Sequence, residues 1–93
     1  MLNVRFSGQF KKDFKKIKKQ GFSNDEEKEF MNIIEDLCKQ KPLNEKYHDH
    51  PLNGNYNGTR EFHLRPDLVV IYKVKDKDLE LLMLRMGSHS ELF

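Results

Sequence analysis

The second half of the chain contains three runs of strand-forming residues separated by very short connections. The runs span residues 59–64, 68–74 and 79–86, and the longest connection between them has four residues. Parallel neighbours need a crossover of about a dozen residues or more, whereas antiparallel neighbours need only a tight turn. The runs therefore predict three consecutive antiparallel strands.

The first half predicts one short strand and two amphipathic helices. Residues 2–6 alternate apolar and polar side chains, which is the period of a half-buried strand. Apolar residues then recur at helical spacing between Ser7 and Gly21. A second helix begins at Ser23, where Ser-Asn-Asp-Glu is typical of a capping box, and Pro42 prevents its continuation. The two apolar stripes are Phe10, Phe14 and Ile17, followed by Phe30, Ile33, Ile34 and Leu37.

This order of elements predicts an α+β fold with the arrangement β-α-α-β-β-β. We expect a twisted, mostly antiparallel sheet with both N-terminal helices packed on one face. The 93 residues fit a single domain, residues 1–93, and exclude a second catalytic domain. Residues 40–58 are polar and carry turn signals at Asn53-Gly54 and Asn57-Gly58, so they predict a long loop. Loops of that length in small domains are usually functional.

The net charge of +2 conceals an uneven distribution. Residues 1–22 carry seven basic side chains and one acidic one, whereas residues 23–37 carry one basic and six acidic. A lysine-rich first helix is a plausible footprint for a nucleic-acid backbone, and a solvated helix face is the alternative interpretation. The lysines of this predicted footprint are Lys11, Lys12, Lys15 and Lys16.

Cysteine content and hydropathy indicate a soluble, cytoplasmic protein. The single cysteine, Cys38, excludes an internal disulfide framework and a zinc site of several thiolates. No apolar run approaches the ~20 residues that cross a bilayer, and the first residues lack the features of a signal peptide. We expect no membrane partner.

Four histidines, all in the second half, are the main candidates for chemistry. Alternation along the strand over residues 59–64 puts Glu61, His63 and Arg65 on one face and Phe62 and Leu64 on the other. We expect the helices to cover the apolar face and to leave the ionisable groups in an open concavity. The histidines are His48, His50, His63 and His89.

Histidines near a phosphodiester favour acid–base cleavage of RNA. Imidazole titrates near neutrality, so a pair of rings can accept a proton from the 2′-hydroxyl and return one to the leaving oxygen. Arg85 or Arg65 would stabilise charge on the phosphoryl oxygens, and Asp67 or Glu61 would orient or tune a histidine. Such a site needs no metal and no cofactor.

Two other interpretations of the histidines remain open at this level. They are ordinary surface residues, or His48-Asp49-His50 and His63 form a metal site, because imidazole and carboxylate suit zinc or iron.

Four segments of the second half, taken together in their order, are much more specific to one family than any single segment. They are His48 to Gly54, Gly58 to Asp67, Ile71 to Lys73, and Leu84 to Phe93. In these segments the chain resembles the YafQ-type toxins of the RelE superfamily. The first half fits the same pattern, with a strand, a basic helix and a second helix.

The resemblance implies the toxin of a bacterial type II toxin–antitoxin pair, a metal-independent endoribonuclease that cuts messenger RNA in the ribosomal A site. Its implied partners are a cognate antitoxin, the ribosome and messenger RNA, with operator DNA reached only through the antitoxin complex. Proton transfer is assigned to His50 and His89 and transition-state stabilisation to Arg85. The remaining matched positions are His63, Asp67, Glu61 and Phe93.

One position departs from the family pattern. Relatives often carry an aromatic residue after the Pro-Asp pair, whereas this chain has Leu68, which cannot stack a base as a ring does. Phe93 and Tyr56 are the remaining candidates for stacking. A non-catalytic binding module of the same fold is the alternative function.

Overall fold

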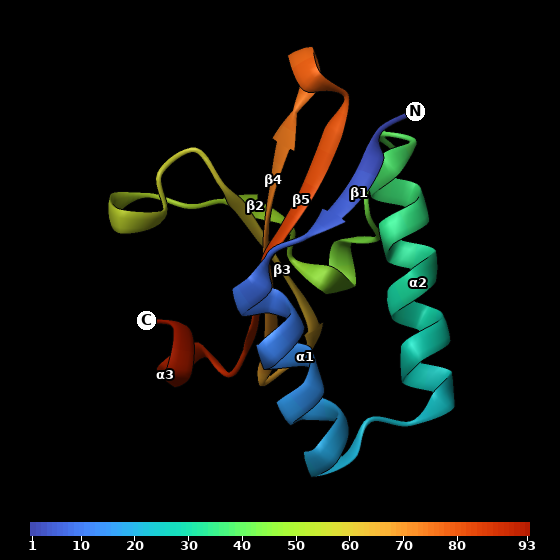
Figure 1. The fold of residues 1–93 in the computed structure, drawn as a ribbon, viewed down its shortest axis with the longest axis vertical. Helices are drawn as coiled ribbons and strands as arrows, with labels where there is room; N and C mark the ends of the chain where they lie inside the picture. The colour runs from blue at the N-terminus through green and yellow to red at the C-terminus, as the bar shows by residue number, and fades with distance from the viewer.

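The computed structural model describes all 93 residues, and its five strands form one mixed sheet with two long helices on one face (Figure 1). Across the sheet the strands follow the order β1-β5-β4-β3-β2. Four neighbouring pairs result: β1 lies parallel to β5, and the other three pairs are antiparallel. The elements are β1 Asn3–Phe6, α1 Gly8–Gly21, α2 Asn24–Cys38, β2 His50–Pro51, β3 Arg60–Arg65, β4 Leu68–Lys75, β5 Glu80–Gly87 and α3 His89–Leu92.

The predicted α+β fold is confirmed, and one strand was missed. The predicted loop over residues 40–58 contains the two-residue strand β2 between short 3₁₀ turns at Glu45–Tyr47 and Gly54–Tyr56. A strand of two residues has no periodicity to detect, so only its pairing with β3 reveals it. A membrane-spanning helix would need a longer apolar stretch than any helix of this fold provides.

The helix ends form as their sequences predict. The Ser7 side chain accepts a hydrogen bond from the Phe10 N–H at the start of α1, and Gly21 ends that helix with a φ of +120°. Ser23 and Glu26 form both bonds of the capping box at the start of α2.

The main core lies between the two helices and the sheet. Residues of both helix stripes, including Phe10 and Phe30, pack against sheet residues such as Phe62, Tyr72 and Met83. Cys38 is buried in this core, and burial raises the pKa of its thiol, which agrees with a packed rather than a catalytic cysteine.

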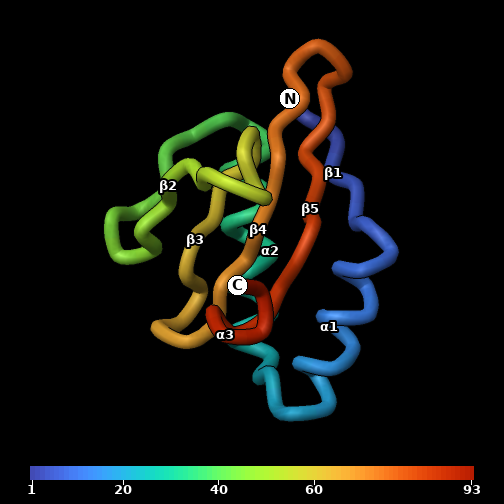
Figure 2. The backbone as a smooth tube through the Cα atoms, turned by 90° about the vertical axis from the view of Figure 1, so that its left-hand side faces the viewer, coloured from blue at the N-terminus to red at the C-terminus, as the bar shows by residue number.

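The second face of the sheet is partly covered rather than open. Val69, Ile71 and Leu92 form a smaller buried cluster there, against which Leu52 and Tyr56 of the loop also pack. Figure 2 shows α3 lying across β4 and β5 on the side opposite α2. The expected open concavity is therefore narrowed by α3 and by the loop that follows β2.

A bulge overturns the predicted placement of Arg65. In the β3–β4 pair, His63 lies opposite Val69 and Arg65 opposite Leu68, so Leu64 is an extra residue. The bulge turns Arg65 to the helix side, where its guanidinium forms an ion pair of 2.7 Å with Glu26. Arg65 does not share a face with Glu61 and His63, because alternation fails at the bulge.

Candidate active site

The centre of the candidate site is the carboxylate of Glu61 on β3, which is only 4% exposed. Its Oε1 atom lies 2.9 Å from Nε2 of His50 and 3.7 Å from Nε2 of His63. Register explains the first contact, because β2 pairs His50 directly with Glu61. The other oxygen, Oε2, is buried without a hydrogen-bond partner. This buried carboxylate holds two imidazoles within one small cluster.

The histidine rings of the cluster lie near one another. The centroids of His50 and His63 are 6.4 Å apart, and the ring of His48 meets that of His63 edge-on at 6.0 Å. Nδ1 of His50 lies 2.6 Å from the carbonyl oxygen of His48. Both ring nitrogens of His50 therefore lie close to oxygen atoms.

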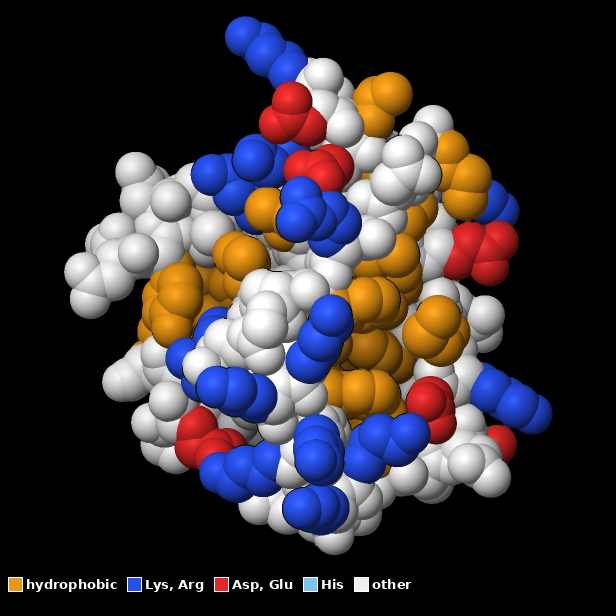
Figure 3. Space-filling model, viewed as in Figure 1, with side chains coloured by type: hydrophobic (Ala, Val, Ile, Leu, Met, Phe, Trp, Pro, Cys, Tyr) orange, Lys and Arg blue, Asp and Glu red, His pale blue; other side chains and the backbone are white.

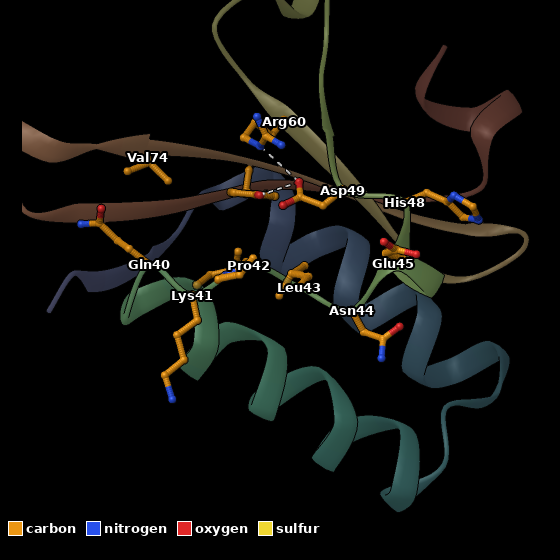
Figure 4. Close-up of a pocket in the computed structure, with 12 residues that line it drawn as sticks. Gln40, Lys41, Pro42, Leu43, Asn44, Glu45, His48, Asp49, Arg60 and Val74 are labelled. Carbon is orange, nitrogen blue, oxygen red and sulfur yellow. Dashed lines mark hydrogen bonds and ion pairs between the residues drawn. The ribbon is translucent and has the colours of Figure 1, made fainter.

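Asp49, between the two loop histidines, faces the other way. Its Oδ1 accepts hydrogen bonds from the Tyr72 hydroxyl at 2.7 Å and from Nε of Arg60 at 3.2 Å. Tyr72 is 1% exposed, and burial together with Asp49 raises its pKa. Figure 4 shows Asp49 beside Arg60 at the edge of a cavity of about 580 Å³, with the His48 ring directed away from both. Asp49 thus anchors the loop to the sheet.

The metal interpretation of the sequence is not supported by this arrangement. Asp49 is directed toward Tyr72 and Arg60 instead of toward the neighbouring imidazoles. No group of three His, Cys, Asp or Glu side chains is arranged to hold a metal ion.

A second group surrounds the C-terminal helix α3. The ring of His89 stacks on Phe93 with centroids 4.6 Å apart, and Phe93 meets Tyr56 edge-on at 5.2 Å. The Tyr56 hydroxyl donates to the carbonyl of Leu92 at 3.0 Å, which fixes the loop to α3. Phe93 is 51% exposed, so the group presents an aromatic surface that a nucleobase could stack on.

Arg85 on β5 is held by a carboxylate of α1. Its Nε lies 2.8 Å and its Nη2 3.4 Å from the oxygens of Asp13. The backbone N–H of Met86 donates to the same carboxylate at 3.0 Å. The hydrogen bond to Asp13 is the main reason that the pKa of Arg85 is raised further above its usual value. Arg85 therefore stays a cation in a fixed orientation.

The other predicted residues lie outside these groups. Asp67 is exposed in the turn between β3 and β4 and has neither a hydrogen bond nor an ion pair. Leu68 is buried in the helix-side core, so it offers no surface to a base. The four lysines of the predicted footprint are exposed on α1, where basic side chains gather in Figure 3. No hydrogen bond or ring contact joins His89 to His50 or His63.

Comparison with known proteins identifies the family. Residues 2–93 match a family model described as "Bacterial toxin of type II toxin-antitoxin system, YafQ". The chain belongs to the YafQ toxin family. The resemblance seen in its sequence motifs is thereby confirmed.

Relatives and solved structures agree with this assignment over nearly the whole chain. The mRNA interferase toxin YafQ of Escherichia coli K12 is 36% identical over 91 residues, which are 98% of this chain and 95% of the relative. A metal-bound toxin structure from Helicobacter pylori superposes with a TM-score of 0.90 at 41% identity, with both chains fully covered. YafQ in the E. coli DinJ-YafQ complex gives 0.83 at 35% identity, covering 100% of this chain and 99% of that one.

In this YafQ-family chain the partners of two acids, Asp49 and Asp13, were not predicted from the sequence; Asp13 pairs with Arg85. The anchoring of Asp49 by Tyr72 and Arg60 leaves no local signal, because the partners lie 23 and 11 residues away. Asp13 did leave a signal, since it is the one acidic side chain among seven basic ones in residues 1–22. A lone acid in a basic segment is a candidate for a specific internal partner.

Proposed function

We propose that this chain is an endoribonuclease that cleaves messenger RNA in the ribosomal A site and so inhibits translation. Membership of the YafQ family and the names of its relatives support the messenger RNA substrate. The single observation that carries the chemistry is the cluster in which the buried Glu61 contacts His50 at 2.9 Å and His63 at 3.7 Å. Imidazoles beside a carboxylate are suited to proton transfer near neutral pH.

The proposed reaction is attack of the 2′-hydroxyl on the adjacent phosphorus. The bond from phosphorus to the 5′-oxygen breaks, leaving a 2′,3′-cyclic phosphate and a free 5′-hydroxyl. His50 and His89 transfer the two protons, one taken from the 2′-hydroxyl and one given to the leaving oxygen. Arg85 stabilises the charge on the phosphoryl oxygens. His63, Glu61 and Asp67 orient and tune the residues that transfer protons, with Asp67 doing so from the turn between β3 and β4.

This assignment requires substrate to bridge the two groups of the site. His50 lies with Glu61 and His63 at β2 and β3, whereas His89 lies with Phe93 on α3. A messenger RNA strand held by the ribosome would lie across the face between them, with one base stacked on Phe93 or Tyr56. The lysines of α1 would contact ribosomal RNA, which they bind without sequence specificity.

The proposal also includes the partners and the cellular site. An antitoxin would bind and neutralise this chain; its relative YafQ of E. coli has been solved in a toxin–antitoxin complex with DinJ. Contact with operator DNA would occur only through the antitoxin complex. Ribosomes as the site of action would make the protein cytoplasmic, and an adjacent reading frame encoding a small antitoxin would support the pairing.

Cleavage of a defined message on programmed ribosomes tests this function. Replacing His50 or His89 by Ala should lower the rate ~10²- to 10⁴-fold, because general acid–base residues contribute about that much, while the melting temperature stays near that of the wild type. A message with a 2′-deoxy nucleotide at the cut should remain intact. Activity should persist in excess chelator, since the proposed mechanism uses no metal.

The outcomes separate the proposal from its alternative. Near-full cleavage by both histidine variants would overturn the site assignment. Inertness of the wild-type chain toward ribosome-bound message, together with tight binding to an antitoxin, would favour a non-catalytic binding module. Loss of cleavage in chelator with recovery on adding a divalent metal would overturn the metal-independent mechanism.

A further inference from the structure

The lone acid of the basic first segment, Asp13, makes more contacts than any other carboxylate near the candidate site. Oδ2 accepts from Nε of Arg85 at 2.8 Å and from the Met86 N–H at 3.0 Å. Oδ1 accepts from Nη2 of Arg85 at 3.4 Å and from Nε2 of Gln9 at 3.0 Å. The carboxylate is therefore saturated by four N–H donors from two elements.

The position of these contacts follows from the sheet topology. β1 pairs with β5 only as far as Met83, after which the chain leaves the sheet and enters α1. The rest of β5 would be a free edge, and Asp13 caps it by accepting the Met86 N–H. A bulge at Leu84 precedes Arg85, which then lies opposite Ile71 on the same face as the buried cluster below α3.

The N–H groups of Arg85 that do not bond to Asp13 could contact a ligand. A guanidinium has five N–H groups, and Asp13 occupies the Nε–H and one Nη2–H. The Tyr56 hydroxyl lies near the guanidinium but donates its hydrogen bond to the Leu92 carbonyl. The other three N–H groups have no hydrogen bond to the protein, and the side chain of Arg85 is 30% exposed while that of Asp13 is only 10% exposed. A planar guanidinium held along one edge keeps its other edge in a fixed direction, which suits bidentate contact to a phosphate.

We infer that Asp13 is a positioning residue that fixes the guanidinium of Arg85 toward the scissile phosphate. The inference rests on the proposed function, because Arg85 acts on phosphate only if the chain cleaves RNA. It adds to that function a link between the helix that would bind ribosomal RNA and the strand that carries the stabilising arginine. Pre-set orientation matters in such a site, because misplacement of a charged group by about 1 Å can cost ~10²-fold in rate.

A double-mutant cycle on ribosomes tests the inference. Asp13→Ala should lower kcat on the order of 10- to 100-fold with little change in KM for programmed ribosomes. Arg85→Ala should lower kcat at least as much, and the double variant should have the kcat of Arg85→Ala, because Asp13 affects kcat through Arg85 while its bond to the Met86 N–H affects stability. Asp13→Asn should fall between the wild type and Asp13→Ala, since it keeps one oxygen but loses the charge. Glu35→Ala, which removes an acid paired with Lys39 on α2, should leave kcat unchanged.

Additive losses of kcat in the double variant would overturn the inference, since they would show that Asp13 acts independently of Arg85. A second measurement does not depend on activity. The Nε–H resonance of Arg85 should be slow to exchange in the wild type and should lose that protection in Asp13→Ala but not in Glu35→Ala. An unprotected Nε–H in the folded wild type would overturn the fixed Asp13–Arg85 contact itself. A protected Nε–H in a chain that fails to cleave message would support that contact and reject the proposed function.

Discussion

The Nζ atom of Lys16 on α1 lies 2.8 Å from Oε2 of Glu91 on α3. Glu91 also accepts hydrogen bonds from the N–H and hydroxyl of Ser88, which begins α3. A helix of four residues is not stable by itself, so its position depends on such contacts. The side chain of Lys16 thus has an internal partner, unlike its exposed neighbours Lys11, Lys12 and Lys15.

We predict that Glu91→Gln loosens α3 without destabilising the core. The hydrogen bond from Lys16, followed by those from Ser88, lowers the pKa of Glu91 to about 2. Because the pKa is lowered, the ionised Glu91 stabilises the fold at pH values above its ordinary pKa of 4.5. This stabilisation is lost as the pH falls toward 2. The stacked Phe93 ring should shift the NMR resonances of the His89 ring. This ring-current shift should therefore decrease in the wild-type protein below pH 4, and it should already be small at pH 6 in Glu91→Gln. Glu35→Gln is the matched control, and unaltered His89 shifts in Glu91→Gln at pH 6 would contradict the prediction.

The salt dependence of ribosome binding should report the lysines of α1. Replacing Lys11, Lys12 and Lys15 by Gln should reduce the slope of log K against log salt by ~0.7 to 0.9 for each phosphate that the variant no longer neutralises. The control exchanges three other exposed lysines, Lys28, Lys41 and Lys77, for Gln, so that the net charge changes equally. Equal slopes for the two triple variants would show that net charge, and not the α1 surface, governs binding.

Glu61→Leu should separate stability from activity. The carboxylate is buried and its Oε2 has no partner, which costs about 1–3 kcal/mol in folding free energy. An apolar side chain beside the buried Ile71 removes that cost, so chemical denaturation should show a more stable protein at pH 7. Cleavage should fall sharply, because His50 and His63 lose the carboxylate that lies beside both rings. A less stable variant would indicate that the histidine contacts outweigh the burial penalty.

Tyr72→Phe should release the loop that carries His50. The hydroxyl donates to the Asp49 carboxylate at 2.7 Å, and buried hydrogen bonds to charged groups contribute about 1.5–3 kcal/mol. Unfolding in urea should show a decrease in stability of that size, and kcat should fall because the loop no longer holds His50 in place. Tyr56→Phe provides a comparison, since its hydroxyl bonds a neutral carbonyl and should cost less. Equal decreases for the two tyrosines would argue against a special role for Asp49.

Local patterns predicted the helices and the main strands but not the pairing that builds the site. The capping box of Ser23 and Glu26 and the apolar run of β4 involve neighbours in sequence, and they formed as expected. Arg65 was misplaced because one extra residue, Leu64, reverses the alternation after it. The contact of Asp13 with Arg85 spans 72 residues, and no periodicity encodes a partner at that separation.

The parallel pairing of β1 with β5 affects when the sheet can form during synthesis of the chain. β5 lies between β1 and β4, so the sheet stays divided until residues 80–87 have been synthesised. The first strand to be synthesised therefore pairs only after the last strand is made, and contacts this distant in sequence slow folding. Because Arg85 lies on β5 and His89 follows it, nearly the whole chain must be synthesised before the candidate site can be complete.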